Sequence, residues 1–152
     1  GKISQARTDL RATIFQDRLF LAGGSPLTDE VWVSDDGINY SLHSHLPQAL
    51  SAGLLLATAN QLIFAGGATN ANSVATVYAI SSQQSTNWTA IGSLPEARSF
   101  SAGFVRQNKY YLSGGEAAGS AQSQIWSSPD GITWTQAGSL PFARSHFTAT
   151  VF

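Results

Sequence analysis

Cysteine is absent from this chain of 152 residues. Its absence excludes disulfides, thiolate nucleophiles and zinc sites with cysteine ligands. Long apolar runs are absent too: none approaches the roughly 18 residues of a membrane-spanning helix, so we expect no membrane partner. Charged residues make up only 11% of the chain, against a usual share of about 25%. Because the net charge of −1 creates no global field, we expect no nucleic-acid partner.

What the chain does contain is a repeated set of markers. Gly-Gly pairs lie 43 and 48 residues apart, beginning at Gly23, Gly66 and Gly114. Leu-Pro pairs lie 48 and 46 residues apart, beginning at Leu46, Leu94 and Leu140. An apolar segment precedes each Gly pair, and two aromatic residues follow it: Trp32 and Tyr40, Tyr78 and Trp88, Trp126 and Trp134. Two independent markers with one period indicate an internal repeat.

Each repeat has the pattern of four short strands joined by turns. The first strand is a stretch of small residues such as 101–105, the second ends at the Gly pair, and the third and fourth carry the aromatics. Turn signals such as Asp36-Gly37 separate the strands, and no segment shows a helical period. We predict an all-β fold of three four-stranded antiparallel sheets, at about 8–47, 50–94 and 98–140. Because such a sheet cannot bury both faces alone, we expect the sheets to stack radially as β-propeller blades.

These markers resemble the Kelch repeat family. Its motif is an apolar strand that ends in Gly-Gly, followed by a Tyr and then a Trp, at a period near 50 residues. The resemblance covers nearly the whole chain, with repeats at about 6–47, 48–95 and 96–141. Trp replaces the usual Tyr at Trp32 and Trp126, and Tyr replaces the usual Trp at Tyr40. These aromatic-for-aromatic changes are compatible with Kelch-type blades.

A second and weaker likeness concerns two turns. Residues 128–134, Ser-Pro-Asp-Gly-Ile-Thr-Trp, are similar to the Asp-box turn of sialidase-like propellers but one residue short of it, and residues 34–40 are a looser version. In that family the turn is structural and remote from the active site. The likeness therefore favours a propeller and implies nothing about glycoside cleavage.

The end of the chain repeats its beginning. Residues 143–152 align with residues 6–15 at an offset of three repeats, so we expect 142–152 to be an extra first strand of a further blade. Propellers need about four to eight blades, and three do not close a ring. Two alternatives stay open: further blades of a longer six- or seven-bladed protein, or a second copy that completes six blades. Two copies would carry two redundant first strands, which favours the longer protein.

The Kelch resemblance implies a ligand site at the mouth of the central channel. The loop before each first strand carries Arg7, Leu50, Arg98 and Arg144 at equivalent positions. Because guanidinium groups suit carboxylates, we expect the three arginines to bind an acidic ligand. The neighbours expected to share this ligand-binding site are Ser99, Ser145 and His146, and Asp9 and Arg11 are further candidates at the same mouth. The alternative is that the arginines bond backbone carbonyls and link the blades, with Asp9 and Glu96 as local carboxylate partners.

Residues typical of catalytic sites do not form a recognisable set. His43 and His45 have the spacing of one strand face but lack a third ligand, so we expect no metal, and no cofactor motif is present. We therefore expect a non-catalytic scaffold that binds a protein, an acidic peptide or a sugar, rather than an enzyme. The family resemblance also allows part of a carbohydrate-active propeller such as a sialic acid epimerase, whose substrate carboxylate would suit the arginines. The resemblance also implies copper radical oxidases, but the absence of cysteine excludes that activity, because the cofactor needs a Tyr–Cys crosslink. The composition does not indicate a cellular compartment.

Overall fold

The protein is built from three four-stranded antiparallel sheets, as the sequence predicts. The structure, a computed structural model, describes residues 3 and 5–151. No helix occurs in these residues, and so none is available that could cross a membrane. The first sheet contains β1 (Arg11–Phe15), β2 (Arg18–Ala22), β3 (Thr28–Ser34) and β4 (Ser41–Leu50).

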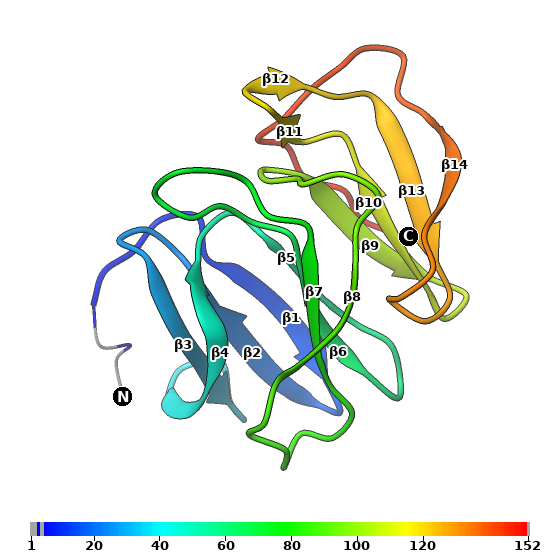
Figure 1. The fold of residues 1–152 in the computed structure, drawn as a ribbon. Coiled ribbons are helices and arrows are strands. Elements are labelled where there is room, and N and C mark those ends of the chain that lie inside the picture. The colour runs from blue at the N-terminus through cyan, green and yellow to red at the C-terminus, as the bar shows by residue number, and fades with distance from the viewer. Residues whose placement is uncertain (1–2, 4, 152) are drawn as a thin grey trace.

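The second and third sheets repeat this order. The second contains β5 (Leu54–Ala57), β6 (Leu62–Ala65), β7 (Thr76–Ile80) and β8 (Thr89–Ser93). The third contains β9 (Ala102–Arg106), β10 (Lys109–Ser113), β13 (Gln124–Ser128) and β14 (Thr135–Ser139). A short hairpin in its loop contains β11 (Glu116–Ala117) and β12 (Ser120–Ala121). The first strands β1, β5 and β9 are neighbours at the inner side, so the sheets are arranged as propeller blades 1, 2 and 3 (Figure 1).

The Gly-Gly pairs lie where one blade meets the next. In each pair the second glycine donates its N–H to a carbonyl at the entry to the following blade: Gly24 to Leu50 at 3.0 Å, Gly67 to Arg98 at 2.8 Å and Gly115 to Arg144 at 2.9 Å. Leu50, expected in a loop, is instead the last residue of β4, because it pairs with Thr28 of β3. The first glycine has positive φ, and a Cβ on it would collide with the same carbonyl oxygen. Both the positive φ and the close approach of the carbonyl oxygen therefore require glycine at the first position of each pair.

A second hydrogen bond at each joint links residues at the centre of the propeller. Asp9, Ala52, Phe100 and His146 occupy equivalent positions, and all four have φ between 52° and 57°, in the left-handed region. The N–H of Ala52 donates to Asp9 O at 3.2 Å, that of Phe100 to Ala52 O at 2.9 Å, and that of His146 to Phe100 O at 3.0 Å. The hydrogen bonds therefore form a chain that runs from blade to blade around the centre.

Two hydrophobic cores fill the spaces between the blades. One lies between blades 1 and 2 and includes Phe20, Phe64 and Trp88, and the other lies between blades 2 and 3 and includes Ile63 and Trp134. Blade 2 contributes to both because side chains of successive residues point to opposite faces of a sheet. Large aromatic side chains such as Trp88 and Trp134 thus fill the widening gap between blades.

The two Asp-box-like turns have the same hydrogen-bond pattern. In the turn after β13, Asp130 Oδ1 accepts the N–H groups of Ile132 and Thr133, each at 2.8 Å, and Trp134 Nε1 donates to Gly131 O at 3.1 Å. In the turn after β3, Asp36 Oδ1 accepts the equivalent N–H groups at 2.8 and 2.7 Å, and the Tyr40 hydroxyl takes the place of the indole. These backbone donors stabilise the ionised carboxylates and lower the pKa of Asp36 and Asp130.

The segment expected to be an extra first strand takes the position of one without forming a ladder. Arg144 N donates to Gln122 O at 3.0 Å, just as Arg98 N donates to Val74 O at 3.1 Å in the preceding repeat. Residues 140–151 nevertheless belong to no strand, and the described part of the chain has no further strand to pair with them. Phe152, the last residue of this expected strand, lies outside the described residues.

Replacing Gly66 with alanine tests the joint between blades 2 and 3. Gly66 has φ +64°, and an added Cβ would collide with Arg98 O. We expect Gly66→Ala to lower the free energy of unfolding by about 3 kcal/mol, measured by urea denaturation. Gly37→Ala is the matched control, because Gly37 has φ +74° but no atom within 4 Å of an added Cβ. It should cost only the backbone strain, about 1 kcal/mol, and equal losses would show that the joint is not tightly packed.

Acid should weaken the fold through the two aspartate turns. A carboxylate whose pKa is lowered by folding contributes stability above its unfolded pKa of about 3.9, and this stability is lost as the pH falls towards the folded value. We therefore expect the urea midpoint to fall between about pH 4 and pH 2. The double variant Asp36→Asn/Asp130→Asn should show a smaller fall over this interval, because its side chains do not titrate. An identical fall in the variant would assign the acid sensitivity to other carboxylates.

Candidate functional site

Arg98, one of the three predicted ligand-binding arginines, is buried inside blade 3. Only 1% of its side chain is exposed. Nη1 donates to Gly114 O at 2.9 Å and Nη2 to Glu96 Oε2 at 2.7 Å, while no partner for Nε is found among the described residues. These bonds hold the entry loop of the blade against its Gly-Gly pair, which matches the structural alternative that the sequence left open.

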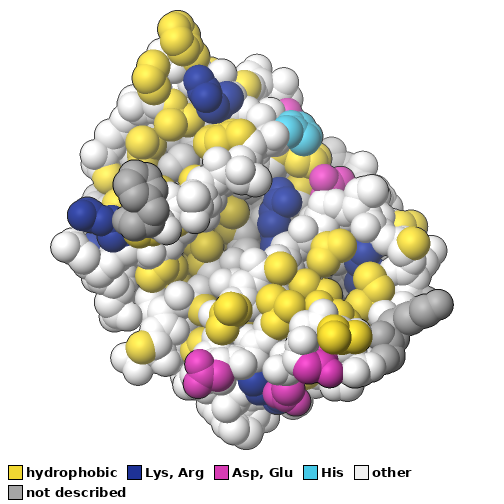
Figure 2. Space-filling model, turned by 180° about the vertical axis from the view of Figure 1, so that it is seen from behind, with side chains coloured by type: hydrophobic (Ala, Val, Ile, Leu, Met, Phe, Trp, Pro, Cys, Tyr) yellow, Lys and Arg dark blue, Asp and Glu magenta, His cyan; other side chains and the backbone are white. Residues whose placement is uncertain are grey.

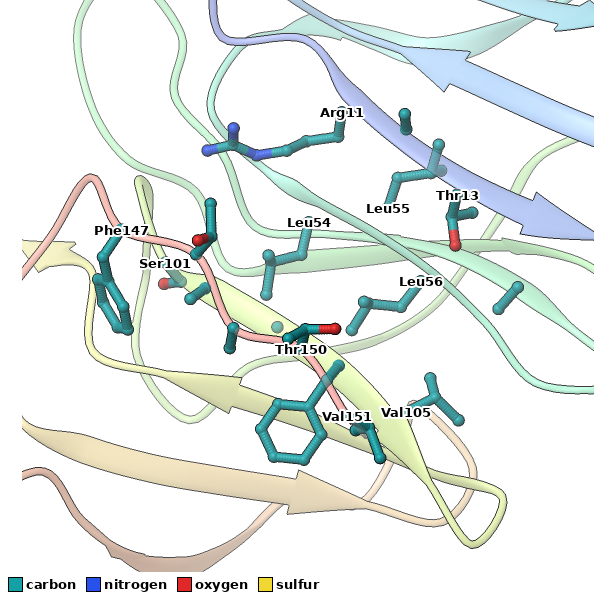
Figure 3. Close-up of a pocket in the computed structure, with 17 residues that line it drawn as sticks. Arg11, Thr13, Leu54, Leu55, Leu56, Ser101, Val105, Phe147, Thr150 and Val151 are labelled. Atoms are coloured by element: carbon teal, nitrogen blue, oxygen red, sulfur yellow. The ribbon is translucent and has the colours of Figure 1, made fainter. Parts of the chain in front are cut away.

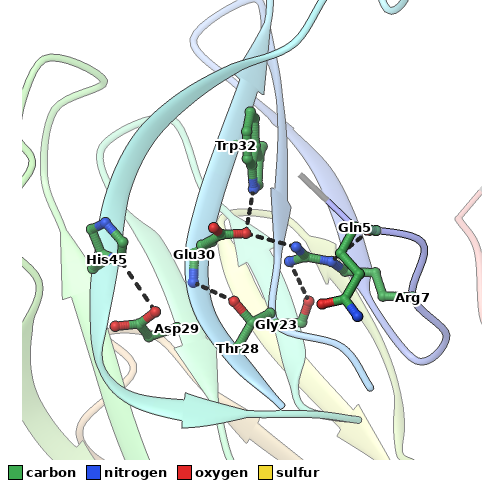
Figure 4. A network of polar contacts seen from close by, with 8 residues as sticks. All are labelled: Gln5, Arg7, Gly23, Thr28, Asp29, Glu30, Trp32 and His45. Atoms are coloured by element: carbon green, nitrogen blue, oxygen red, sulfur yellow. Dashed lines mark hydrogen bonds and ion pairs between the residues drawn. The ribbon is translucent and has the colours of Figure 1, made fainter. Parts of the chain in front are cut away.

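Arg7 makes the same kind of link in blade 1. Its Nη2 donates to Glu30 Oε2 at 2.6 Å, and Nη1 reaches Gly23 O at 3.5 Å. Trp32 Nε1 also donates to Glu30 Oε2, at 3.1 Å, so the side chains of Arg7 and Trp32 converge on one carboxylate (Figure 4). Leu50, the equivalent residue of blade 2, is buried in the core between blades 1 and 2 instead.

Arg144 differs from the other two arginines. It is exposed, and its guanidinium makes no hydrogen bond or ion pair with the part of the chain that the structure describes. The three predicted arginines therefore have different settings, with two buried against local glutamates and one open to solvent. A shared acidic-ligand site on all three stays a prediction that the contacts of Arg7 and Arg98 disfavour.

The other three predicted residues, Ser99, Ser145 and His146, lie together around Glu116. They are on the face formed by the loops before the first strands and after the second strands, which we call the loop face. Ser145 Oγ donates to Glu116 Oε1 at 2.9 Å, and His146 Nδ1 lies 3.5 Å from the same oxygen. The imidazole stacks on Phe100 with a centroid distance of 3.9 Å. Because the same ring nitrogen faces both the serine and the glutamate, the group is a hydrogen-bonded cluster and not a serine–histidine–acid relay.

A cavity of about 280 Å³ opens beside this cluster, between the loops of blades 2 and 3. Ser99 lines it, and its hydroxyl lies 2.8 Å from the hydroxyl of Ser73. Asn72, Phe100 and Glu116 also line this cavity. The loop face thus offers hydroxyl, amide and carboxylate groups around an aromatic side chain.

A larger groove, of about 380 Å³, runs along the inner side of the blades. Its walls are β1, β5, β9 and the segment 147–151 (Figure 3). Viewed from behind, the molecule is hollowed near its middle, and a basic side chain lies in the hollow (Figure 2). Residues 99–101 separate the two cavities, because Ser99 and Phe100 line the first and Ser101 lines the groove.

Arg11 is the charged residue among those that line the groove. Its Nε donates to Gly53 O at 2.8 Å, and neither Nη has a hydrogen bond to the described residues. Burial lowers the pKa of Arg11, while the nearby charge of Asp9 acts in the opposite direction. Three other arginines, Arg7, Arg18 and Arg98, each hold a carboxylate oxygen within 2.7 Å, whereas Arg11 forms no such ion pair in the described structure.

The sequence places Arg11 only among the neighbours of the channel mouth and assigns the ligand to Arg7, Arg98 and Arg144. A signal was present, since the equivalent positions of the other repeats hold Leu54, Ala102 and Thr148, and a charged residue breaks that pattern of uncharged side chains. The pair His43 and His45 is occupied by local bonds: His43 contacts Ser44 Oγ and Gln83 O, each at 2.8 Å, and His45 pairs with Asp29 (Figure 4). No group of three or more potential metal ligands occurs in the described residues.

Comparisons with known proteins identify the fold alone. No family model matches the chain, and no curated protein matches it. The solved structure of YjhT is similar, with a TM-score of 0.81 and 14% sequence identity over 93% of this chain. The chain spans 54% of the YjhT chain, about half its length. At this identity the likeness shows a shared fold, consistent with the blades described above.

Arg98→Ala tests whether the buried arginines hold the blades together. The substitution removes the bonds to Gly114 O and Glu96 and leaves a cavity, so we expect a loss of about 2–3 kcal/mol in the free energy of unfolding. The matched control is Arg144→Ala, which removes an exposed side chain and should change stability by less than about 0.5 kcal/mol. Equal urea midpoints for the two variants would contradict the structural role of Arg98.

Proposed function

We propose that this chain is part of a Kelch-type propeller that binds a ligand without chemistry of its own, and that Arg11 receives an anionic group of that ligand in the central groove. The observation that supports this proposal is the pair of Nη groups of Arg11, which lack a protein acceptor in the described structure. Arginine offers a planar fork of donors that matches a carboxylate or a phosphate. Partial burial strengthens the attraction by lowering the local dielectric constant.

The loop-face cluster suits a different part of the same ligand. Glu116 gives this cluster a carboxylate, which repels an anion, while Ser99, Ser145 and Asn72 offer neutral hydrogen-bonding groups. Ser99 and Phe100 line the loop-face cavity and the next residue, Ser101, lines the groove, so a ligand that extends over this segment would have its anionic end at Arg11. An acidic peptide and an acidic sugar both have this polarity.

A carbohydrate-active propeller is the second candidate. The observation in its favour is that the two Nη groups of Arg11, which have no hydrogen bond to the described residues, lie near a group of hydroxyl and amide side chains, a combination that would fit a sugar acid such as sialate. This candidate differs from the first in one measurable respect, because an epimerase speeds the interconversion of its sugar whereas a scaffold only binds it.

Calorimetry with defined probes tests the proposal. The probes are N-acetylneuraminic acid, a glutamate-rich octapeptide and, as a neutral control, N-acetylmannosamine. We expect one acidic probe to bind and Arg11→Gln to weaken it about tenfold or more, as for the loss of a charged hydrogen bond. Arg106→Gln is the control. Arg106 is exposed on β9, the strand of blade 3 that corresponds to β1, and does not line the groove.

Two outcomes would overturn the anion site. Either neither acidic probe binds the full chain, or Arg11→Gln binds as well as the parent. If the sugar acid binds, proton NMR of its anomers shows whether the protein speeds their exchange. Faster exchange would replace the scaffold by the carbohydrate-active candidate.

A further inference from the structure

The face of blade 1 that points away from blade 2 has the side chains of a blade-to-blade contact, but no blade of the described structure packs on it. Leu21 and Trp32 pair across β2 and β3 on this face and are half-buried. Their equivalents in blade 2, Phe64 and Tyr78, pair in the same way and are buried against blade 1. Ile14 on the same face is 67% exposed. We call this face, made by Ile14, Leu21 and Trp32, the blade-1 edge.

Blade 3 presents the opposite half of such a joint. Phe104 and Tyr111 pair across β9 and β10, and their rings stack with a centroid distance of 4.8 Å. Both are half-buried, whereas the equivalent pair of blade 2, Leu56 and Ile63, is buried against blade 3. We call the face of Phe104 and Tyr111 the blade-3 edge.

The two edges are complementary to each other rather than to themselves. Blade 2 carries both types of face, one packed on blade 1 and the other on blade 3, so the chain already contains two examples of the joint that the edges would make. A backbone donor on blade 1 is also left open for such a joint, because the N–H of Asp9 has no hydrogen-bond acceptor among the described residues. Its equivalents in Ala52, Phe100 and His146 each donate to the preceding blade.

We propose that a second copy of this chain covers both edges. Two copies related by a twofold axis would place each blade-1 edge on the partner's blade-3 edge and close a ring of six blades, within the four to eight that propellers use. Each joint continues an interface that the chain forms twice within itself. Two copies also have about the combined length of the YjhT chain, of which one copy spans 54%.

The segment 142–151 must yield its place in this ring. It now gives Phe100 O the N–H of His146, the acceptor that Asp9 of an incoming blade requires. Of the two equivalent segments, β1 pairs with β2 along its whole length, whereas 142–151 forms no strand. The incoming β1 therefore displaces 142–151, and the redundant strand becomes a competitor of ring closure.

The first test is the mass of the full chain in solution. Sedimentation equilibrium across a concentration series should show a closed dimer of twice 16.1 kDa. Leu21→Glu and Tyr111→Glu each place a carboxylate in the joint and should raise the dimer dissociation constant about a hundredfold or more. Ile132→Glu is the matched control, since Ile132 is 52% exposed and contacts blade 2 at Gly92 instead of an open edge. Far-ultraviolet circular dichroism checks that each variant keeps its strands.

The second test is specific to the displaced segment. Deletion of 142–152 should tighten the dimer about tenfold or more by removing the competitor. The amide of Asp9 should exchange with solvent more slowly at dimer concentrations than in dilute protein. A monomer at all concentrations, open-ended polymers, a dimer insensitive to both edge variants, or a dimer that the deletion weakens would each overturn the proposal. Anion binding at Arg11 is measured separately, so its failure would not affect this result.

Discussion

The hydrogen bond from the second glycine of each pair to the entry loop of the next blade is the contact on which the arrangement depends. It brings two backbones so close that the preceding residue has no room for a Cβ, as the collision of an alanine at Gly66 with Arg98 O illustrates. The same loop then turns through a residue with positive φ and forms the second bond at the centre. The blades are therefore joined by backbone groups near the centre and by apolar side chains further out.

This division explains how a chain with so few charges distributes them. Arg7 and Arg98 each bond a carbonyl of their own Gly-Gly pair and a nearby glutamate, which compensates the cost of burying a guanidinium. Leu50 shows that this link is not needed in every blade, because an apolar side chain fills the same position when it can join the core. Arg11 is the exception, because its acceptor among the described residues is a backbone carbonyl and none of their carboxylates pairs with it.

The fold could be predicted from the sequence because its strongest signals come from backbone constraints. Gly-Gly pairs and Leu-Pro pairs recur with one period, and the sheets at 11–50, 54–93 and 102–139 follow the predicted register closely. The candidate site was harder to predict because it depends on which polar groups already satisfy each other. Equal spacing placed Arg7 and Arg98 at equivalent positions, and the sequence offered Glu96 as a local partner, which Arg98 does bond. The spacing could not show that Arg7 bonds Glu30, 23 residues away, instead of the nearby candidate Asp9. Nor does spacing reveal that Ala52 and Phe100 adopt positive φ, since neither residue type favours it.

The rim and the centre of each blade obey different constraints. The turns at Asp36 and Asp130 form their hydrogen bonds within one blade, so they need no neighbour, and blade 2 folds without an aspartate turn of this kind. At the centre the bonds run from blade to blade, and the groove walls come from three blades and the last segment together. A ligand at Arg11 would therefore contact a surface whose shape depends on how many blades surround it. Since binding stabilises the state that binds best, ligand affinity and closure of the ring would be thermodynamically linked.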